Sequence, residues 1–564
     1  MKLRTLYFAT LMCPLALAAA QGQTTASDIP HLRKQGTATQ LIVDGKPFLA
    51  LSGELSNSTA TSVEYMKLVW PRLVASKVNT VLAGVSWNQI EPQPGKFDFS
   101  VLDGVIQGAR IHHMRLMLLW FGSWKNGLSS YAPDWVKKDF ERFPRAQVAG
   151  GRSIELLSVF SDTNRDADVR VFAALLRHIK AMDGQQHTVI MIQVENEVGM
   201  NGDTLDRSPV ADQAYAAPVP KELMDYLQQH KDTLIPEFRQ VWEAAGSKTN
   251  GTWEEVFGKG VATDEIFMAW HYARYVGKVA EAGKAEYPIP MNVNAALPRT
   301  STIADLAAKG REPGRGNIFA IGGPMDDLMD VWRAGAPRID ILSPDVYSDR
   351  DFVAWCARYS RSGNPLFIPE TRNNMEAKAM YMFGRHDAVG LSWMGVERAP
   401  TPDAEMVRGF DLIAQLAPLI AKHQGDGSMS AVLLAADDPP KKVQVGNYTM
   451  EVARMRPRVA PGATAPAPPP GFAAAIFIAT GPDEYYAAGT DVAVTFAPNT
   501  PGPEHAGIGT VEEGVFVDGR WIPSRQIAGD ETGEGQNLSL RSHPIDRIPD
   551  RYVGIQHFTL YRYR

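Results

Sequence analysis

Two acidic segments, each placed directly after a short apolar run, contain the side chains best suited to chemistry. Residues 192–197 read Ile-Gln-Val-Glu-Asn-Glu, and residues 366–371 read Leu-Phe-Ile-Pro-Glu-Thr. Hydrolysis of a glycosidic bond needs two carboxyl groups, one that donates a proton and one that acts as nucleophile or base. Glu197 and Glu370 are the candidate pair. Taken alone, the cluster at 195–197 fits a partly solvated loop end equally well.

Eight short apolar runs alternate with amphipathic segments between residues 40 and 425, and these elements must position the acids. Parallel strands that are buried on both faces read as continuous apolar runs, and their alternation with helices is typical of a parallel sheet. Eight such units predict an α/β fold of the (β/α)8 TIM barrel type. A doubly wound open sheet is the alternative, but the chain has no Gly-rich phosphate loop to support it. The runs are residues 48–51, 79–87, 115–122, 188–194, 289–293, 339–343, 366–368 and 388–394.

Glu197 and Glu370 lie at the ends of the fourth and seventh runs. The active site of such a barrel forms at the C-terminal ends of its strands, so both carboxyl groups are expected at one mouth. Alternate side chains of a strand face opposite sides. Glu195 and Glu197 are therefore expected to point one way and Asn196 the other.

The pattern changes after residue 425. Period-two alternation takes over, as in residues 515–522 and 557–563, together with frequent turn residues, which is typical of a smaller all-β, sandwich-like domain. The Pro- and Ala-rich stretch 456–471 is expected to be a surface loop of that domain. The long segment 199–287, with helical patterns near 221–230 and 264–282, follows a strand end and is expected to wall the site. The expected division is residues 1–20, a barrel over 21–425 with an insertion at 199–287, and a β domain over 426–564.

The first twenty residues have the features of a secretory signal peptide. Lys2 and Arg4 precede an apolar run that ends in three alanines, Ala18 to Ala20. The run is short for a membrane span, although an uncleaved anchor is the alternative. We expect no membrane span in the mature chain and an exported protein, either periplasmic or secreted.

Charge and residue usage argue against other classes of function. The chain has 57 Lys and Arg against 63 Asp and Glu, a net charge of −6, and no basic stripe, so no nucleic-acid partner is expected. His112 and His113 are adjacent and do not share a helix face, and the other histidines are scattered. We expect no metal and no cofactor. Cys356 is expected to be an inert core thiol, and the oligomeric state is left open.

Three motifs in the first half of the barrel carry a family resemblance. They are Leu-Ser-Gly-Glu at 51–54, Trp-Asn-Gln-Ile-Glu-Pro at 87–92 followed by Gly-Lys-Phe-Asp-Phe at 95–99, and Gln-Val-Glu-Asn-Glu-Val-Gly at 193–199. With Glu370, they resemble glycoside hydrolase family 35, the β-galactosidases. The trailing β domain resembles the small domain of a bacterial branch of that family. The family's Ala-Glu-Trp cluster after the third strand is missing, because residues 119–125 read Leu-Trp-Phe-Gly-Ser-Trp-Lys.

The resemblance implies a role for each candidate residue. Glu370 is the nucleophile and Glu197 the acid/base, on strands seven and four, as in the large clan of retaining barrel glycosidases. Asn196 hydrogen-bonds the 2-hydroxyl group of the sugar. Tyr347 hydrogen-bonds the nucleophile, and Trp393 stacks under the reacting sugar.

Three further side chains are candidates for binding substrate in the pocket. Glu54 ends the first strand and is expected to bind a sugar hydroxyl. Trp120 and Trp124 are expected to line the pocket, with core packing as the alternative.

The function expected from these residues is that of a retaining, exo-acting β-galactosidase. The resemblance implies an oligosaccharide substrate, with terminal galactose on plant-derived chains of the xyloglucan or pectin type. Another exo-β-glycosidase of the same clan, such as an arabinosidase or a glucosidase, is one alternative. A noncatalytic carbohydrate-binding protein is the other, although such a protein has no need of the paired Glu197 and Glu370.

Overall fold

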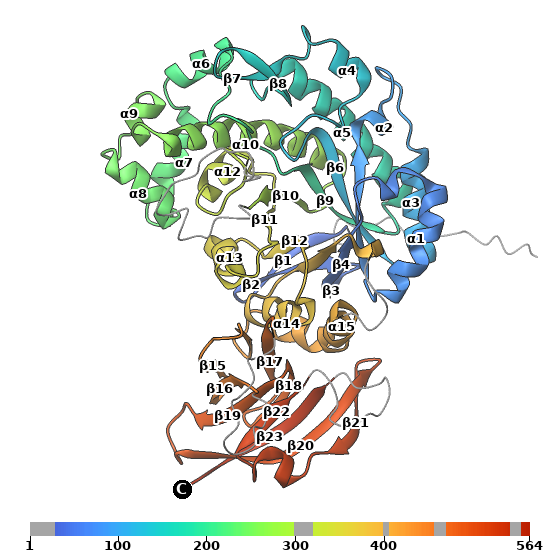
Figure 1. Cartoon of the computed structure of the whole chain (residues 1–564), viewed down its shortest axis with the longest axis vertical. Coiled ribbons are helices and arrows are strands. Elements are labelled where there is room, and N and C mark those ends of the chain that lie inside the picture. Colours follow the sequence, from blue (N-terminus) through green and yellow to red (C-terminus); the bar gives the residue numbers. More distant parts are fainter. Residues whose placement is uncertain (1–28, 298–319, 399–404, 456–469, 542–553) are drawn as a thin grey trace, which may run out of the picture.

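The larger part of the chain is a closed barrel of eight parallel strands, drawn in the upper part of Figure 1. The computed structural model describes residues 29–297, 320–398, 405–455, 470–541 and 554–564. Strands that follow one another along the chain are paired, except the sixth and seventh, and the eighth strand pairs with the first. The backbone N–H of Val346, just after the sixth strand, donates to the carbonyl of Glu370 in the seventh at 2.9 Å and closes the ring. The strands are β4 (Ala50–Glu54), β5 (Thr80–Ser86), β6 (Arg115–Lys125), β9 (Val189–Asn196), β10 (Met291–Ala296), β11 (Ile341–Asp345), β12 (Phe367–Thr371) and β13 (Gly390–Met394).

The predicted barrel is confirmed, and the open sheet is excluded. Each of the eight predicted apolar runs overlaps one barrel strand, and one helix covers the outside after each strand. The helix after the third strand, α5, buries one face against the barrel, where Phe172, Leu176 and Ile179 are fully buried. The covering helices are α1 (Val63–Ala75), α3 (Ser100–Ile111), α5 (Asp162–Asp183), α10 (Val261–Glu286), α12 (Met329–Gly335), α13 (Phe352–Tyr359), α14 (Met375–Arg385) and α15 (Glu405–His423).

A small antiparallel sheet, which the sequence patterns did not reveal, seals the N-terminal end of the barrel. It consists of β1 (His31–Gln35), β2 (Ala38–Val43) and β3 (Lys46–Phe48). Leu41 and Val43 of β2 belong to the apolar cluster inside the barrel, together with Met117 and Ile190. Because this end is filled with apolar side chains, only the C-terminal mouth is available for polar chemistry.

The insertion after β9 folds into a helical layer on the outside of α10 and α12. Its helices are α6 (Pro209–Ala216), α7 (Lys221–Gln229), α8 (Pro236–Ala244) and α9 (Trp253–Phe257), and the chain then enters α10. Asn201, near its start, donates to the carbonyls of Asn126 and Gly127 in the loop after β6. The insertion therefore contacts the loops at the barrel mouth through its first residues, and α6 to α9 lie further out (Figure 1).

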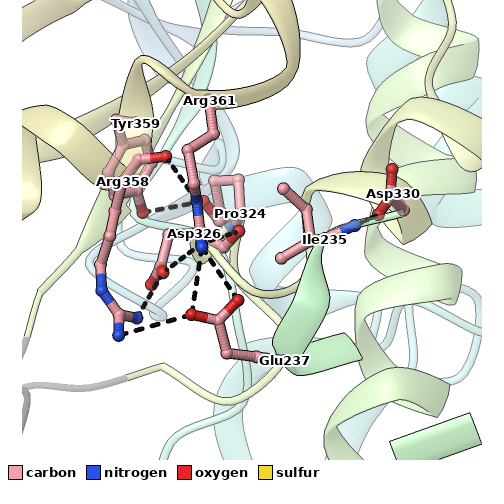
Figure 2. A network of polar contacts seen from close by, with 8 residues as sticks. All are labelled: Ile235, Glu237, Pro324, Asp326, Asp330, Arg358, Tyr359 and Arg361. Atoms are coloured by element: carbon pink, nitrogen blue, oxygen red, sulfur yellow. Dashed lines mark hydrogen bonds and ion pairs between the residues drawn. The ribbon is translucent and has the colours of Figure 1, made fainter. Parts of the chain in front are cut away.

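A buried ionic network anchors this helical layer to the barrel (Figure 2). Asp326, whose side chain is 1% exposed, accepts from Arg358 at 2.7 Å and from Arg361 at 2.9 Å. Arg361 also donates to both carboxylate oxygens of Glu237 in α8. Two arginines thus connect an insertion helix to the segment before α12.

Residues after the barrel form two antiparallel sheets that pack face to face around their own apolar cluster, which includes Val452, Phe477, Tyr485 and Phe558. The predicted sandwich-like domain is confirmed, and the alternating segment 515–522 is the hairpin of β20 and β21. One sheet holds β14 (Met429–Leu434), β17 (Ala473–Ala479), β18 (Glu484–Thr490), β20 (His505–Val517), β21 (Arg520–Gln526) and β23 (Ile555–Tyr563). The other holds β15 (Lys441–Val445), β16 (Tyr448–Arg454), β19 (Val492–Pro498) and β22 (Asn537–Leu540).

The β domain packs its larger sheet against α14 and α15 of the barrel (Figure 1). Ala431 of β14 and Ile476 of β17 belong to the same apolar cluster as Phe383 of α14. The side chain of Gln415 on α15 accepts from the backbone N–H of Phe516 at 3.1 Å. A continuous apolar core therefore connects the two parts.

Two sequence predictions lie outside the described residues, namely the signal peptide at 1–20 and nearly all of the loop at 456–471. None of the helices in the described ranges is both long and apolar enough to span a membrane. Cys356 is buried in α13, and burial raises the pKa of its thiol.

Candidate active site

Polar side chains gather at the C-terminal ends of six barrel strands, where each apolar run gives way to polar residues. All of them are buried, although apolar surroundings disfavour unpaired polar groups. The parallel strands end at the same mouth, which brings residues distant in sequence into one cluster. The members are Glu54 of β4, Lys125 of β6, Asn196 and Glu197 at the end of β9, Asn294 of β10, Asp345 of β11 and Glu370 of β12.

Glu197 and Glu370, the two acids predicted from sequence, face each other across this mouth. One carboxylate oxygen from each of Glu197, Asp345 and Glu370 lies within 4.8 Å of the others. A retaining glycosidase places its two carboxyl groups ~5–5.5 Å apart, whereas an inverting one leaves ~6.5–9.5 Å for a water molecule. The approach of the two acids is therefore closer to the retaining arrangement than to the inverting one.

Hydrogen bonds from neighbouring strands fix the two acids. The hydroxyl group of Tyr347, in the loop after β11, donates to Oε2 of Glu370. Asn294 accepts from the backbone N–H of Glu197 at 2.9 Å and donates to Oδ2 of Asp345 at 2.7 Å. Tyr347 is thus placed beside the nucleophile candidate, and Asn294 joins the acid/base candidate to Asp345.

Lys125 supplies a positive charge to the cluster. Its ammonium group donates to Oδ1 of Asn196 at 2.9 Å and lies 4.9 Å from the centre of the Phe121 ring. Burial opposes the charge, but the nearby carboxylates, with Glu370 the strongest, outweigh burial and raise the pKa of Lys125. Lys125 is therefore a stable cation within an acidic cluster.

Several polar atoms of the cluster have no hydrogen-bond partner among the described residues. They are both carboxylate oxygens of Glu54, Nδ2 of Asn196, Oδ1 of Asp345 and Oε1 of Glu370. Burial, followed by the charge of Glu370, raises the pKa of both Glu54 and Asp345 well above its usual range. The set contains both donors and acceptors, which suits a ligand with several hydroxyl groups.

Glu195 does not join this cluster, contrary to the expected alternation. Its carboxyl group accepts from the backbone N–H groups of Ser123 and Trp124, at 3.2 and 2.7 Å, and neighbours Asp168 of α5. The backbone is left-handed at Glu195 (φ 61°) and at Glu197 (φ 45°), so side chains at the end of β9 do not alternate regularly. Glu197 reaches the barrel mouth while Glu195 packs behind it.

Trp120 and Trp124 lie behind the barrel wall and not in the pocket. The indole N–H of Trp120 donates to Asp168 at 2.9 Å, and that of Trp124 donates to the carbonyl of Leu157 at 3.0 Å. Both side chains are fully buried, and the ring of Trp124 packs against Tyr272 and Tyr275 of α10. The expectation that they line the pocket is corrected to a role in core packing.

Trp393 ends β13, where its backbone is paired with Gly53 and Thr371 at the mouth. It is half-buried and packs against the core cluster. Of the eight predicted site residues, the structure therefore gathers Glu54, Asn196, Glu197, Tyr347 and Glu370, places Trp393 at the rim, and sets Trp120 and Trp124 apart.

Sequence reasoning missed three members of the cluster. Lys125 and Asp345 are the last residues of buried strands, and Asn294 lies two residues before the end of β10. A polar residue near the end of an apolar run was the available signal. A single polar residue at such a position is common. Only the folded barrel shows that these three residues lie in one cluster.

Three acidic side chains this close, Glu197, Asp345 and Glu370, are the sole group among the described residues with the spacing to share a cation. The ammonium group of Lys125 already brings a positive charge to them. The three carboxyl groups therefore share the positive charge of Lys125 in this structure.

Comparison with known proteins relates both parts of the chain to described families. Residues 64–264 match the family model of glycoside hydrolase family 42, described as beta-galactosidase, and residues 406–539 match DUF5597, a domain of unknown function. A β-galactosidase of Xanthomonas manihotis is 31% identical over 215 residues. This match covers 36% of the chain and spans about a third, 32%, of that relative.

Solved structures of β-galactosidases also align with the chain. The enzyme of Bacillus circulans sp. alkalophilus aligns over 66% of this chain and 57% of its own, with a TM-score of 0.43 and 14% identity. That of Marinomonas ef1 aligns over 66% and 60%, with a TM-score of 0.41 and 12% identity. A catalytic mutant of a family 42 β-galactosidase from G. stearothermophilus aligns over 67% and 57%, with a TM-score of 0.40 and 14% identity.

The resemblance to family 35 is corrected by this comparison. The model that matches the barrel is that of family 42, and the model that matches the β domain is DUF5597. The motifs at 51–54, 87–92 and 193–199 lie at the ends of barrel strands. Short strand-end motifs such as Asn-Glu are shared across barrel glycosidases, so they indicate the reaction type better than the family.

Proposed function

We propose that the chain is a retaining β-galactosidase. The observation that carries the proposal is the pair Glu197 and Glu370, whose carboxylate oxygens approach within 4.8 Å at the C-terminal mouth of the barrel. This close approach agrees better with the short carboxyl separation of a retaining enzyme, ~5–5.5 Å, than with the ~6.5–9.5 Å of an inverting one. The family 42 match and the Xanthomonas relative support galactose as the sugar that is released.

In the proposed reaction, a carboxylate oxygen of Glu370 bonds to the anomeric carbon while the glycosidic bond breaks. Glu197 gives its proton to the departing oxygen, which leaves as an alcohol. Glu197 then takes a proton from water, whose oxygen bonds to the anomeric carbon and releases Glu370. The hydrogen bond from Tyr347 holds Glu370, and the free Nδ2 of Asn196 is the donor for the 2-hydroxyl group.

We extend the proposal to exo-acting hydrolysis of galactose-tipped, plant-derived oligosaccharides of the xyloglucan or pectin type. Glu197 is 5% and Glu370 4% exposed, and such deep burial suits a chain end entering a pocket better than the middle of a long polymer. The pattern of residues 1–20 supports export to the periplasm or the medium, where such oligosaccharides are met.

The first test is hydrolysis of aryl β-glycosides by the purified mature chain, with Glu370→Gly as the control. The galactoside is expected to be cleaved, with turnover reduced by about 10³-fold or more in the control because the covalent step is lost. Cleavage of a glucoside or an arabinoside in its place would redirect the proposal to another exo-β-glycosidase. Near-normal galactoside turnover by Glu370→Gly would remove Glu370 from its role.

A second test examines Glu197 and the retention of configuration. Azide is expected to rescue Glu197→Ala, because an anion that needs no proton removal can attack the glycosyl-enzyme in place of water. The product should be the β-glycosyl azide. Formation of the α-azide would contradict retention.

A further inference from the structure

Lys125 occupies a position that the proposed reaction does not yet explain. It ends β6, its side chain is almost completely buried, and its backbone is paired with Asn196 of β9. Four carboxyl groups on four other strands contribute to its electrostatic environment: Glu54, Glu197, Asp345 and Glu370. A lysine is seldom buried without a strong reason, because removing an ammonium group from water is costly.

The hydrogen bond from Lys125 determines how Asn196 presents its amide group. An ammonium group is only a donor, so the side-chain oxygen of Asn196 must face it, and the 2.9 Å contact involves that oxygen. The amide nitrogen Nδ2 is then turned away from Lys125 and has no partner among the described residues. Lys125 therefore makes Asn196 a donor toward the substrate rather than an acceptor.

The charge of Lys125 also acts on the acids around it. Burial and mutual repulsion raise the pKa of Glu54 and Asp345, and Lys125 is a group that opposes this effect at both. The groups that face Lys125 are Glu54 from β4, Glu197 and Asn196 from β9, Asp345 from β11 and Glu370 from β12, with the Phe121 ring beneath it.

We propose that Lys125 is a positioning residue of the active site, which orients Asn196 for the sugar and offsets the negative charge of the four surrounding carboxyl groups. The inference rests on the proposed glycosidase function. It adds a residue that acts through Asn196 and through charge, without bonding to the reacting atoms.

The test compares the pH dependence of kcat/KM for Lys125→Met, Lys125→Gln and Lys125→Arg on an aryl β-galactoside. Lys125 opposes the rise in pKa of Glu54 and Asp345, so loss of the cation disfavours the ionised forms of these neighbouring acids. The acid limb of the profile should therefore move to higher pH by about 1–3 pH units in the Met and Gln variants. The Arg variant keeps the charge and should keep the limb within about 0.3 units. An unshifted acid limb in both uncharged variants would overturn the charge role.

The Gln variant separates the two parts of the proposal. Gln retains a hydrogen-bond donor for Asn196 but not the charge. The Gln variant should show the same shift of the acid limb as the Met variant. At its own pH optimum, however, its kcat/KM should be about tenfold higher than that of the Met variant. Equal losses in both variants would contradict the orienting role of Lys125.

Lys284→Met is the matched control. Lys284 is also a mostly buried lysine paired with a carboxylate, Asp340, but the pair lies at the start of β11, at the opposite end of the barrel. This variant should lose stability and leave the pH profile unchanged. A profile shift as large as that of Lys125→Met would show that any buried cation has the same effect and would refute the proposal.

Thermal unfolding provides a readout that does not depend on glycosidase activity. Without Lys125, the four surrounding carboxyl groups have no neighbouring cation when they ionise at higher pH, and the folded state is destabilised. The fall in Tm caused by Lys125→Met should therefore be larger at about pH 8 than at about pH 5. The fall for Lys284→Met should be similar at both. If the wild-type chain hydrolysed no glycoside, the proposed function would fail, and the thermal comparison would still decide the charge role: a fall in Tm independent of pH would contradict it.

Discussion

At the scale of single residues, the barrel strand ends hold polar atoms that have no partner within the part of the chain that the structure describes, at the proposed sugar site. A buried group without a hydrogen bond costs about 1–3 kcal/mol, and five such atoms belong to Glu54, Asn196, Asp345 and Glu370. A fold selected for stability alone would replace them. Under the proposed function, substrate hydroxyl groups would be the partners of these atoms beside Glu197.

A substitution of Glu54 can measure both the stability cost of these polar groups and their contribution to activity. Burial, and then the charge of Glu370, raises the pKa of Glu54 in the folded protein. Protonated Glu54 therefore contributes its full stability below the ordinary pKa near 4.5, and this contribution is lost as the pH rises through the pKa of the folded state. Glu54→Gln cannot ionise. Its Tm should match that of the wild type at about pH 4 and exceed it at about pH 8, by the equivalent of about 1–3 kcal/mol.

The same variant should lose galactoside turnover. A carboxyl group that accepts sugar hydroxyls is replaced by an amide with one acceptor, for which a loss of about 10–100-fold in kcat/KM is expected. Thermal scans across pH and steady-state kinetics measure the two effects together. A Tm difference that does not change with pH, or full turnover, would remove Glu54 from the proposed sugar-binding set.

At the scale of elements, the end of β9 places one acid in the pocket and one behind it. The left-handed backbone at Glu195 and Glu197 is uncommon outside glycine and costs about 1–3 kcal/mol per residue. Contacts with β6 and α5 stabilise it: Glu195 accepts from the backbone of Ser123 and Trp124, and lies beside Asp168. Gly122 keeps the space open, because a Cβ there would lie 2.6 Å from Oε1 of Glu195.

The buried pair Glu195 and Asp168 predicts that the protein loses stability at alkaline pH. Burial, and then Asp168, raises the pKa of Glu195, so its stabilising contribution falls as pH rises. Glu195→Gln keeps an oxygen that accepts from the backbone N–H of Trp124 and turns a permanent donor toward Asp168, while the N–H of Ser123 still donates to Asp168 at 3.1 Å. Its alkaline unfolding midpoint should move up by about one pH unit, with kcat/KM within about threefold of the wild type.

The exposed Glu141→Gln is the control for that measurement and should not move the alkaline midpoint. Circular dichroism during alkaline titration follows the transition in both variants. If Glu195→Gln unfolded at the same pH as the wild type, the Glu195–Asp168 pair would not limit alkaline stability.

The sequence predicted the elements better than the directions of their side chains. The barrel strands were visible because buried parallel strands read as unbroken apolar runs, as in 115–122 and 188–194. Trp120 follows the regular alternation of β6, in which Leu119 and Phe121 belong to the apolar cluster inside the barrel and Trp120 belongs to the outer one. The position of Trp124 was missed because the pairing of β6 with β9 shifts register between Trp120 and Lys125. A register shift changes which side chains face the barrel interior, and it depends on a neighbouring strand about 70 residues away in sequence. Lys125 was missed for the same reason.

At the scale of the whole molecule, the β domain and the barrel share one apolar core, so they should unfold together. Gly384 of α14 lies at their contact, where a Cβ would come within 2.7 Å of Ile476 and 2.8 Å of Ala431. Gly384→Val should overpack this contact and lower the free energy of unfolding by about 1–3 kcal/mol. Because Gly384 lies near the far end of α14 from Glu370, kcat should not change.

Calorimetry of Gly384→Val and of Gly529→Val tests this coupling. Gly529 lies in the same β domain with open space around its Cβ position, and its substitution should change stability by less than about 0.5 kcal/mol. With a shared core, the unfolding of barrel and β domain should remain one transition that moves to lower temperature in Gly384→Val. Two separate transitions, with only one of them displaced, would mean that the apolar contact between α14 and β17 does not couple the domains, and that the β domain folds without the support of the barrel.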